Sequence, residues 1–367
     1  MGLLEQGIRQ AVSRRRSLPE GWTENREKSE CEKAGSGKSR MKIMVYEHFS
    51  AGGCGGVADS SDLHSSGWAM LHACLEDALE AGHQVYTLVD RRLRENLPAG
   101  CAVKLVSEGR ASSAFEEMLD EVDAVLPIAP ETGGILASLT SLAEHSGKLL
   151  LGSTTQAIRI AGDKLASSLA LANHGCKVPV TALWPVPAEK LNTPGPWILK
   201  PRSGTGCEGI YLTASPEAVT VSEEEYIIQE YVPGTAASVA MIAGKSGMLV
   251  LSVNLQHIEF DSRVHYKGGA TPLRHPMSRT ATEYAKKVPA AIPGLRGYVG
   301  IDMVLTENEI YVIEVNPRVT LTYCGLRRIA FGNLLKPIID AALGLDLQKE
   351  IHLAGAVQFD SMGRIFS

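Results

Sequence analysis

Short apolar segments recur along the chain from residue 41 onward, and polar or glycine-rich residues end most of them. Met41 to Tyr46 is typical of a buried strand, and the glycine-rich turn Ser50 to Gly56 follows it. A helical pattern then runs from Ser65 to Ala81, and a second strand from His83 to Val89. The order strand, turn, helix and strand predicts a βαβ unit, and hence a parallel sheet with helices on its faces.

Two later apolar segments extend the predicted parallel sheet. Asp123 to Ala129 predicts a buried strand, and a helix follows Gly134. Leu149 to Leu151 predicts a short strand before a helix capped at Gly152 to Thr155.

Glu47 and Glu131 each lie just past one of these predicted strands. Ligands bind open α/β sheets at the carboxyl ends of the strands. Each carboxylate is therefore a candidate to hold a substrate ammonium, and the alternative for each is a solvated loop acid.

In the second half of the chain, turns rather than helices join most of the apolar segments. Tyr226 to Gly234 predicts a strand that runs into a linker. Ser238 to Ile242 and Met248 to Val253 predict an antiparallel pair around the turn Gly244 to Gly247.

Several polar segments surround this second sheet. Asn254 to Gln256 and Tyr266 to Gly269 flank a polar loop that either shapes a substrate pocket or is plain surface. Thr320 to Gly325 reads as a loop rich in Thr and Gly, and Arg327 to Leu343 as a helix. The residues from Gln348 onward predict a strand and a tail.

Two lysines stand where a bound phosphate would explain them. Lys164 falls in the first turn of a predicted helix, where a cation opposes the helix dipole unless it faces an anion. Lys200 ends a strand, and the segment Ser203, Gly204, Thr205 and Gly206 then leads to another strand. This order suits a flap whose backbone N–H groups cover a triphosphate, and a plain hairpin turn is the alternative.

Tyr298 to Leu305 and Ile310 to Asn316 predict a β-hairpin. Glu314 and Asn316 are two residues apart, so they share a face of the second strand. A three-residue loop at 307 to 309 would make Thr306 face Ile310 and bring Asp302 opposite Glu314, whereas a one-residue slip would bring it opposite Ile313.

Asp302, Glu314 and Asn316 together predict a metal site. Two carboxylates and an amide in an apolar segment destabilise a fold unless a cation binds them. Their oxygens are hard ligands, which favours Mg²⁺ or Mn²⁺ carrying phosphate over zinc. A solvated hairpin with a chance acidic pair is the alternative.

Composition limits the classes of function. The chain has 367 residues, 44% of them apolar and 21% charged, with a net charge of -5. Residues 1–40 carry nine Lys and Arg against six Asp and Glu and few core-forming residues, so we expect disorder or a stray helix near Leu3 to Val12. No domain is basic, which argues against nucleic acid. Seven cysteines without a Cys-x-x-Cys pair favour a reducing cytoplasm, and no apolar run is long enough to span a membrane.

Two nucleotide-binding motifs are rejected. Gly37-Lys38-Ser39 is no P-loop, because the first glycine of that motif would fall at Glu32 and no strand precedes it. Gly53, Gly55 and Ala58 match a dinucleotide fingerprint only loosely, because Asp59 to Ser66 separates the turn from the helix that should bind phosphate.

From Met41 to about Leu345, the chain resembles the ATP-grasp superfamily. The resemblance rests on the order of five elements: Lys164, Lys200 with its glycine flap, Gln229 to Val232, Asp302, and Glu314 with Asn316. The resemblance implies an α/β domain followed by an ATP-grasp fold of two α+β subdomains. The implied units are a disordered extension (1–40), a pre-ATP-grasp domain (41–155), a small subdomain with the flap (156–228), a large subdomain with the metal site (229–345) and a C-terminal tail (346–367).

The resemblance also implies roles for single residues. Lys164 and Lys200 would bind phosphate, and Arg318 would clamp the transferred phosphoryl group. The adenine would lie against the backbone of Gln229, Glu230, Tyr231 and Val232. Many relatives carry an acid for the ribose hydroxyls where this chain has Ala236 and Ala237.

Shorter segments resemble the tyramine-glutamate ligases of methanofuran and methylofuran biosynthesis. They are Tyr46 to Gly53, Ile128 to Glu131, Tyr266 to Gly269, and Glu314 to Tyr323. The implied function is an ATP-dependent carboxylate-amine ligase for small molecules, with Glu47, Glu131, Tyr266 and Thr320 as candidate substrate contacts. A phosphotransferase or a non-catalytic nucleotide-binding module on the same scaffold is the alternative.

Overall fold

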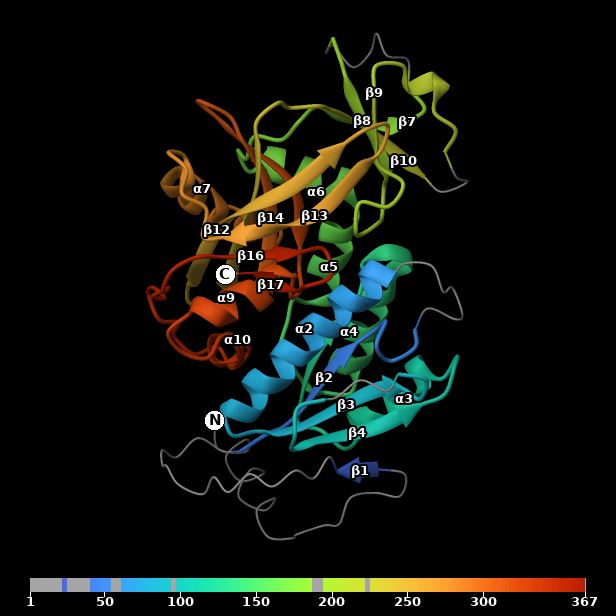
Figure 1. Ribbon diagram of the computed structural model, residues 1–367, viewed down its shortest axis with the longest axis vertical. Helices are drawn as coiled ribbons and strands as arrows, with labels where there is room; N and C mark the ends of the chain where they lie inside the picture. The colour runs from blue at the N-terminus through green and yellow to red at the C-terminus, as the bar shows by residue number, and fades with distance from the viewer. Residues whose placement is uncertain are drawn as a thin grey trace.

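Three β-sheets organise the chain in the computed structural model, which describes residues 22–24, 40–53, 61–93, 97–186, 194–221 and 225–366 (Figure 1). In Figure 1 a six-stranded sheet lies at the bottom, a four-stranded sheet at the top and a seven-stranded sheet between them. The predicted combination of a parallel α/β domain with antiparallel sheets is confirmed.

The six-stranded sheet has the order β1-β4-β3-β2-β5-β6. Strands β2 to β6 pair in parallel, as predicted, and β1 pairs antiparallel with β4. The strands are β1 (Trp22–Glu24), β2 (Lys42–Glu47), β3 (Gln84–Asp90), β4 (Cys101–Val106), β5 (Ala124–Ile128) and β6 (Leu149–Leu150). The disorder predicted for residues 1–40 is wrong for β1, and residues 1–21 and 25–39 lie outside the described residues.

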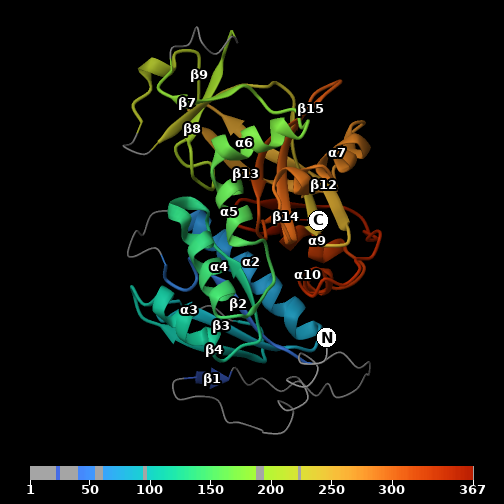
Figure 2. The same ribbon diagram turned by 180° about the vertical axis from the view of Figure 1, so that it is seen from behind.

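Alternating side chains of β2 reach both faces of this sheet. Ile43 and Val45 share a core with helix α2 (Ser61–Glu80), which starts four residues before the predicted Ser65. Met44 and Tyr46 point to the other face, where α3 (Ala111–Leu119) and α4 (Ile135–His145) lie (Figures 1 and 2). Burial on both faces explains why the strand is apolar throughout.

Helices α5 (Thr155–Gly162) and α6 (Lys164–Asn173) lead from the first sheet to the second. The side chain of Thr154 accepts a hydrogen bond from the Ala157 N–H, so the predicted cap of α5 is confirmed. The second sheet is antiparallel with the order β7-β10-β8-β9. Its strands are β7 (Thr181–Trp184), β8 (Trp197–Pro201), β9 (Tyr211–Thr213) and β10 (Tyr226–Glu230).

The seven-stranded sheet is antiparallel, with the order β15-β14-β11-β12-β13-β16-β17. Its strands are β11 (Thr235–Ala243), β12 (Met248–Phe260), β13 (Val264–Thr271), β14 (Gly297–Leu305), β15 (Ile310–Asn316), β16 (Val357–Asp360) and β17 (Ile365–Phe366). Helices α5, α6, α7 (Ser278–Ala285) and α8 (Val288–Ala291) pack on one face. Helices α9 (Thr322–Ile329) and α10 (Leu335–Ala342) cover part of the other.

Four predictions about this part of the chain are wrong. Residues 254–256 and 266–269 lie inside β12 and β13, so the loop between the strands is shorter than expected. Helix α9 begins within the segment 320–325 that was predicted as a loop. The helix predicted from Arg327 to Leu343 is two helices, and Gly332 between them takes a φ of 107° that a helix cannot contain. The strand predicted after Gln348 is present as β16, but β16 and β17 both extend the sheet, so the separate tail predicted there is wrong.

Helix α2 joins the first and third sheets into one continuous core. Its apolar side chains pack on the six-stranded sheet, and the same cluster continues into α9, α10 and the seven-stranded sheet. The Tyr323 hydroxyl of α9 donates a hydrogen bond to the buried Asp77 of α2. Arg327 of α9 forms ion pairs with Glu76, Asp77 and Glu80.

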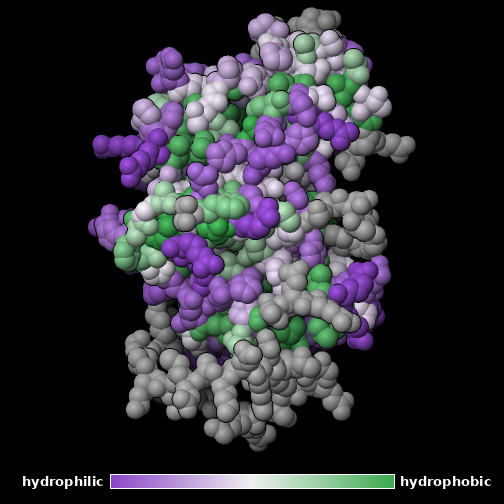
Figure 3. Space-filling model, in the orientation of Figure 1, coloured by the Kyte–Doolittle hydropathy of each residue, from purple (hydrophilic) through white to green (hydrophobic). Residues whose placement is uncertain are grey.

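The surface of the molecule is mixed. On the face in Figure 3, hydrophilic side chains predominate, and hydrophobic side chains lie among them. Within the described residues, no helix combines the length and the apolar character needed to cross a bilayer.

Candidate functional site

The three sheets meet around a cavity of about 430 Å³. The ends of β2 and β5 and the start of α2 form one end of the cavity, β8 and β10 form the other, and β11 to β15 form its floor. Most of the predicted site residues line it: Glu47, Lys164, Lys200, Gly204, Thr205, Gly206, Gln229, Glu230, Tyr231, Val232, Tyr266, Asp302, Glu314, Asn316, Arg318 and Thr320. Glu131 and Ser203 are not part of the lining.

Strand alternation explains why Asp302 faces the cavity. Gly300, Asp302 and Val304 of β14 line the cavity, whereas Val299 and Ile301 belong to the core beneath the sheet. A polar residue at an even-numbered position of this strand therefore points to the ligand side.

In strand β15, a β-bulge directs Glu314 to the same side of the sheet as Asp302. Leu305 pairs with Ile310, so the predicted pairing of Thr306 with Ile310 is wrong. The register shifts between Asp302 and Met303, and Asp302 then lies opposite Glu314 as predicted.

The bulged residue is Ile313. Ile310 and Val312 face the core, as does Val315, while the consecutive residues Ile313 and Glu314 both line the cavity. One extra residue thus reverses the alternation of the strand and directs Glu314 to the cavity.

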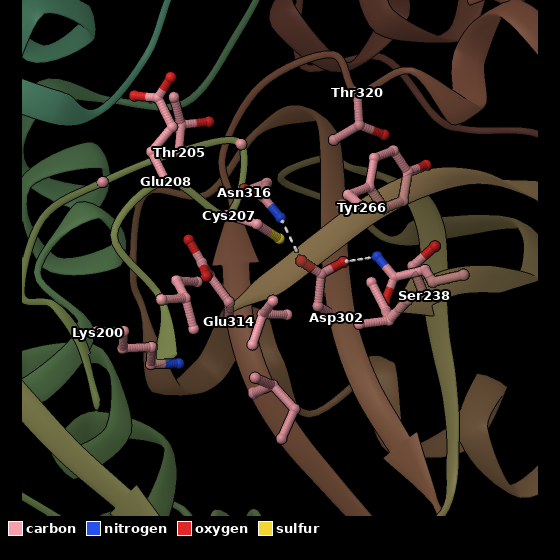
Figure 4. A pocket seen from close by; sticks show the side chains of 18 of the residues that line it. Lys200, Thr205, Cys207, Glu208, Ser238, Tyr266, Asp302, Glu314, Asn316 and Thr320 are labelled. Carbon is pink, nitrogen blue, oxygen red and sulfur yellow. Dashed lines mark hydrogen bonds between the residues drawn. The ribbon is translucent and has the colours of Figure 1, made fainter. Parts of the chain in front are cut away.

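The two carboxylates of the hairpin differ in their partners. Asp302 accepts hydrogen bonds from Gln256 (2.9 Å) and Asn316 (3.1 Å), and Figure 4 shows the bond from Asn316. Burial and the nearby charge of Glu314 raise the pKa of Asp302 to about 7. Burial alone would raise the pKa of Glu314 too, but Lys164 and Lys200 outweigh it and hold that pKa below its usual value.

Lys164 and Lys200 are buried cations beside Glu314. The Lys164 ammonium lies 3.1 Å from the Glu314 carboxylate and donates to the Gly204 carbonyl at 2.7 Å. Burial lowers the pKa of Lys200 to about 8, against the attraction of Glu314. A buried pair of amines with one carboxylate leaves positive charge for an anionic ligand such as phosphate.

Asp302, Glu314 and Asn316 fit a divalent metal ion by their donor chemistry. Mutual repulsion of the two buried carboxylates is relieved when a cation lies between them. Asn316 donates its Nδ2 to Asp302, which leaves its amide oxygen as the third ligand atom. Within the described residues, no group of three or more His, Cys, Asp or Glu side chains could hold a metal. The set therefore suits a metal that also takes oxygens from a ligand, as Mg²⁺ and Mn²⁺ do.

The glycine flap between β8 and β9 lies against the site. The Thr205 hydroxyl accepts a hydrogen bond from Arg318 at 2.9 Å. Gly206 lies so close to α2 that an added Cβ would be 2.8 Å from a methyl group of Leu63. Cys207 takes a φ of 63°, and burial together with Glu314 and Asp302 raises its pKa to about 12, so the thiol is neutral. Cys207 is not among the site residues predicted from the sequence, although it lines the cavity.

Arg318 is held from the first domain. Its guanidinium donates to both carboxylate oxygens of Glu131, at 3.0 and 3.2 Å. Such a bidentate pair fixes the orientation of the guanidinium. The structure therefore favours Glu131 as the residue that positions Arg318, in place of the predicted ammonium contact. Ser203 likewise lies outside the cavity, at 3.5 Å from the Glu131 carbonyl.

Residues 229–232 form the other end of the cavity. The Gln229 amide donates to Thr181 at 2.9 Å, so this side chain belongs to the small sheet. The Glu230 N–H donates to the Val180 carbonyl at 2.8 Å. The rings of Tyr231 and Phe260 meet edge to face with centroids 5.7 Å apart. This mixture of backbone groups and apolar wall suits a planar heterocycle.

The remaining predicted contacts lie along the floor. Tyr266 points into the cavity beside Asp302 in Figure 4, and Thr320 shares a hydrogen bond of 3.1 Å with Tyr298. Gln256 was predicted to flank a loop, and its contact with Asp302 was not predicted. Its position two residues after Asn254, which places both side chains on one face of the strand, was the available signal.

Two sequence families match successive parts of the chain. The family described as the pre ATP-grasp 3 domain matches residues 83–158, and the family described as the ATP-grasp domain matches residues 161–322.

Curated relatives with significant similarity include two ligases. The tyramine–L-glutamate ligase of Methanocaldococcus fervens is 34% identical over 208 residues, which are 57% of this chain and 62% of the relative. The enzyme of the same name from Methanocaldococcus jannaschii is 31% identical over 227 residues, 61% of this chain and 66% of the relative. The chain thus matches slightly less than two thirds of the length of each ligase.

Solved structures share the fold. An ATP-grasp superfamily protein from Archaeoglobus fulgidus superposes with a TM-score of 0.67 and 25% identity, covering 87% of this chain and 92% of that chain. The L-amino acid ligase from Bacillus licheniformis gives a TM-score of 0.65 at 15% identity, covering 88% and 79%.

Proposed function

The chain belongs to the ATP-grasp family, and on that premise we propose that it is an ATP-dependent ligase that joins a carboxylate to an amine through an acyl phosphate. The observation that carries the proposal is the convergence of Lys164, Lys200, Arg318 and the acidic hairpin on one cavity. The residues 229–232 would hold the adenine of ATP, and the flap would cover the phosphates.

These side chains would act mainly by positioning the phosphates and by stabilising the negative charge of the transition state. In phosphoryl transfer the charge spreads over the phosphoryl oxygens, and buried cations aimed at it lower the barrier. Lys164 and Lys200 would bind the phosphates, and Arg318, oriented by Glu131, would hold the transferred group. When bound, Mg²⁺ or Mn²⁺ on Asp302, Glu314 and Asn316 would neutralise phosphate charge.

The curated relatives suggest the substrates. Both ligases take their names from tyramine and L-glutamate, and we propose the same pair for this chain. The five described cysteines are free thiols, which supports a reducing cytoplasm as the place of action.

Release of phosphate from ATP tests the proposal. With Mg²⁺, glutamate and tyramine, we expect ADP, phosphate and an amide in equal amounts, with the amide identified by mass spectrometry. A screen of other amino acids and amines follows if this pair is inactive. A stable phosphorylated product that forms without an amine would instead indicate a phosphotransferase.

A further inference from the structure

The end of the cavity formed by β2 and α2 contains a buried carboxylate that the mechanism above does not use. Glu47 is 1% exposed and lines the cavity. Phe49, Leu63 and Met70 line the same end, which is therefore largely apolar.

The conformation of Glu47 is set by the turn that follows β2. Its Oε2 accepts hydrogen bonds from the Ser50 N–H (2.7 Å) and the Ser50 hydroxyl (2.6 Å). Its Oε1 accepts one, from the Phe49 N–H at 3.1 Å. A carboxylate oxygen has two acceptor positions, so Oε1 can accept a further hydrogen bond.

Helix α2 closes over this carboxylate. Gly67 lies so near that an added Cβ would be 2.6 Å from the carboxylate carbon of Glu47. Among the described residues, no lysine, arginine or histidine forms an ion pair with Glu47. The more distant positive charge of Arg318 lowers the pKa of Glu47 only in part. A buried carboxylate without a cation destabilises a fold, so a cationic ligand is the expected partner.

We infer that Glu47 is the general base of the second half-reaction and removes a proton from the ammonium group of the amine substrate. This inference rests on the proposed ligase function. The ammonium would donate to Oε1, and its proton would move to that oxygen. The nitrogen lone pair would then attack the acyl carbon, the C–N bond would form, and the C–O bond to phosphate would break. Solvent would take the second nitrogen proton and, later, the proton held by Glu47.

The electrostatic surroundings suit a base that works near neutral pH. Burial raises the pKa of Glu47 to about 7, against its hydrogen bonds and the charge of Arg318, which lower it. On α2, Asp62 is the other carboxylate that lines this end of the cavity. His48 shares a hydrogen bond with the Tyr46 hydroxyl at 3.1 Å, and the end of β5 presents no titratable side chain to the cavity.

The test compares two nucleophiles that intercept the same acyl phosphate. Tyramine is an ammonium ion at neutral pH and needs a base, whereas hydroxylamine is largely uncharged and does not. For Glu47→Gln we expect hydroxamate formation from glutamate within about threefold of the wild type. Amide formation with tyramine should fall by about 10²- to 10³-fold, because general base catalysis is lost.

The pH profile gives a second readout. Wild-type amide formation should rise with pH to a plateau with a midpoint near 7, since only the ionised carboxylate accepts a proton. In Glu47→Gln this midpoint should vanish, and the rate should climb about tenfold per pH unit with the free amine. Glu47→Asp keeps a carboxylate at a shorter reach, so it should lose less amide formation than Glu47→Gln.

Three results would overturn the inference: equal loss of hydroxamate and amide in both Glu47 variants, normal amide formation in Glu47→Gln, or a selective loss of the amide in Asp62→Asn. If both Glu47 variants failed to fold, as judged by circular dichroism, the carboxylate would be structural and the inference would be wrong. The proposed function fails separately, when the wild-type protein makes no hydroxamate with any carboxylate.

Discussion

At the scale of single residues, the site depends on the buried carboxylate of Glu314, which balances the charges of Lys164 and Lys200. Among the described residues, Glu314 alone forms an ion pair with Lys164, at 3.1 Å, and its charge also raises the pKa of Lys200 against the effect of burial. We expect Glu314→Gln to slow phosphate release by about 10²- to 10³-fold, because the variant removes the negative charge of a metal ligand and the countercharge of two buried amines. The measurement is amine-dependent phosphate release at saturating ATP and Mg²⁺.

The matched control for Glu314 lies on the same hairpin. Glu309 is about half exposed and pairs with Lys177 at the surface. Glu309→Gln should leave the rate unchanged, because exposed ion pairs contribute little. Phosphate release at the wild-type rate by Glu314→Gln would contradict the assignment of the metal site.

At the scale of secondary structure elements, the bulge in β15 adds a side chain to the cavity wall. Deletion of Ile313 would let the alternation run regularly from Val312, so Glu314 would still face the cavity opposite Asp302. Only the apolar contact of Ile313 would be lost, a loss of about 1.5–3 kcal/mol. We expect KM for ATP to rise by about 10- to 100-fold with kcat within a few-fold of the wild type.

Ile313→Ala is the control for that deletion. It keeps the bulge and shortens the side chain, so we expect a smaller rise in KM in the same direction. A large fall in kcat with an unchanged KM in the deletion variant would mean instead that the bulge aligns the metal ligands.

At the scale of the whole molecule, the contact between α2 and α9 joins the first domain to the seven-stranded sheet. Arg327 pairs with the buried Asp77 and with Glu76 and Glu80. Replacing Arg327 by Met would leave Asp77 buried without a cation. We expect the free energy of unfolding to fall by about 3–5 kcal/mol, measured by urea denaturation.

Arg328→Met provides the matched control for this interface. Arg328 is the neighbouring residue of α9 and is exposed. Its replacement should change stability by less than about 0.5 kcal/mol. Equal stability of the two variants would show that the contact between α2 and α9 does not hold the domains together.

Much of this protein follows from local chemistry and can be predicted from the sequence. The order of strand, turn, helix and strand predicted the parallel sheet, and β-branched and aromatic residues predicted the hairpin. Because strand alternation is a property of the backbone, Glu314 and Asn316 could be assigned to one face. Hard oxygen ligands in an apolar strand, and lysines at a helix start and a strand end, indicated metal and phosphate before any coordinates. These residues do line one cavity.

Other features were decided only by tertiary structure, because they depend on contacts between residues far apart in the chain. Glu131 and Arg318 are 187 positions apart, so no local pattern could show that the acid orients the guanidinium. The bulge at Ile313 depends on how β15 pairs with β14, and one extra residue changes which face every later side chain occupies. The burial of Glu47 under Gly67 likewise requires α2 to pack on β2, and burial alone raises the pKa of that carboxylate. Sequence specified which chemical groups are present, and packing decided which of them meet.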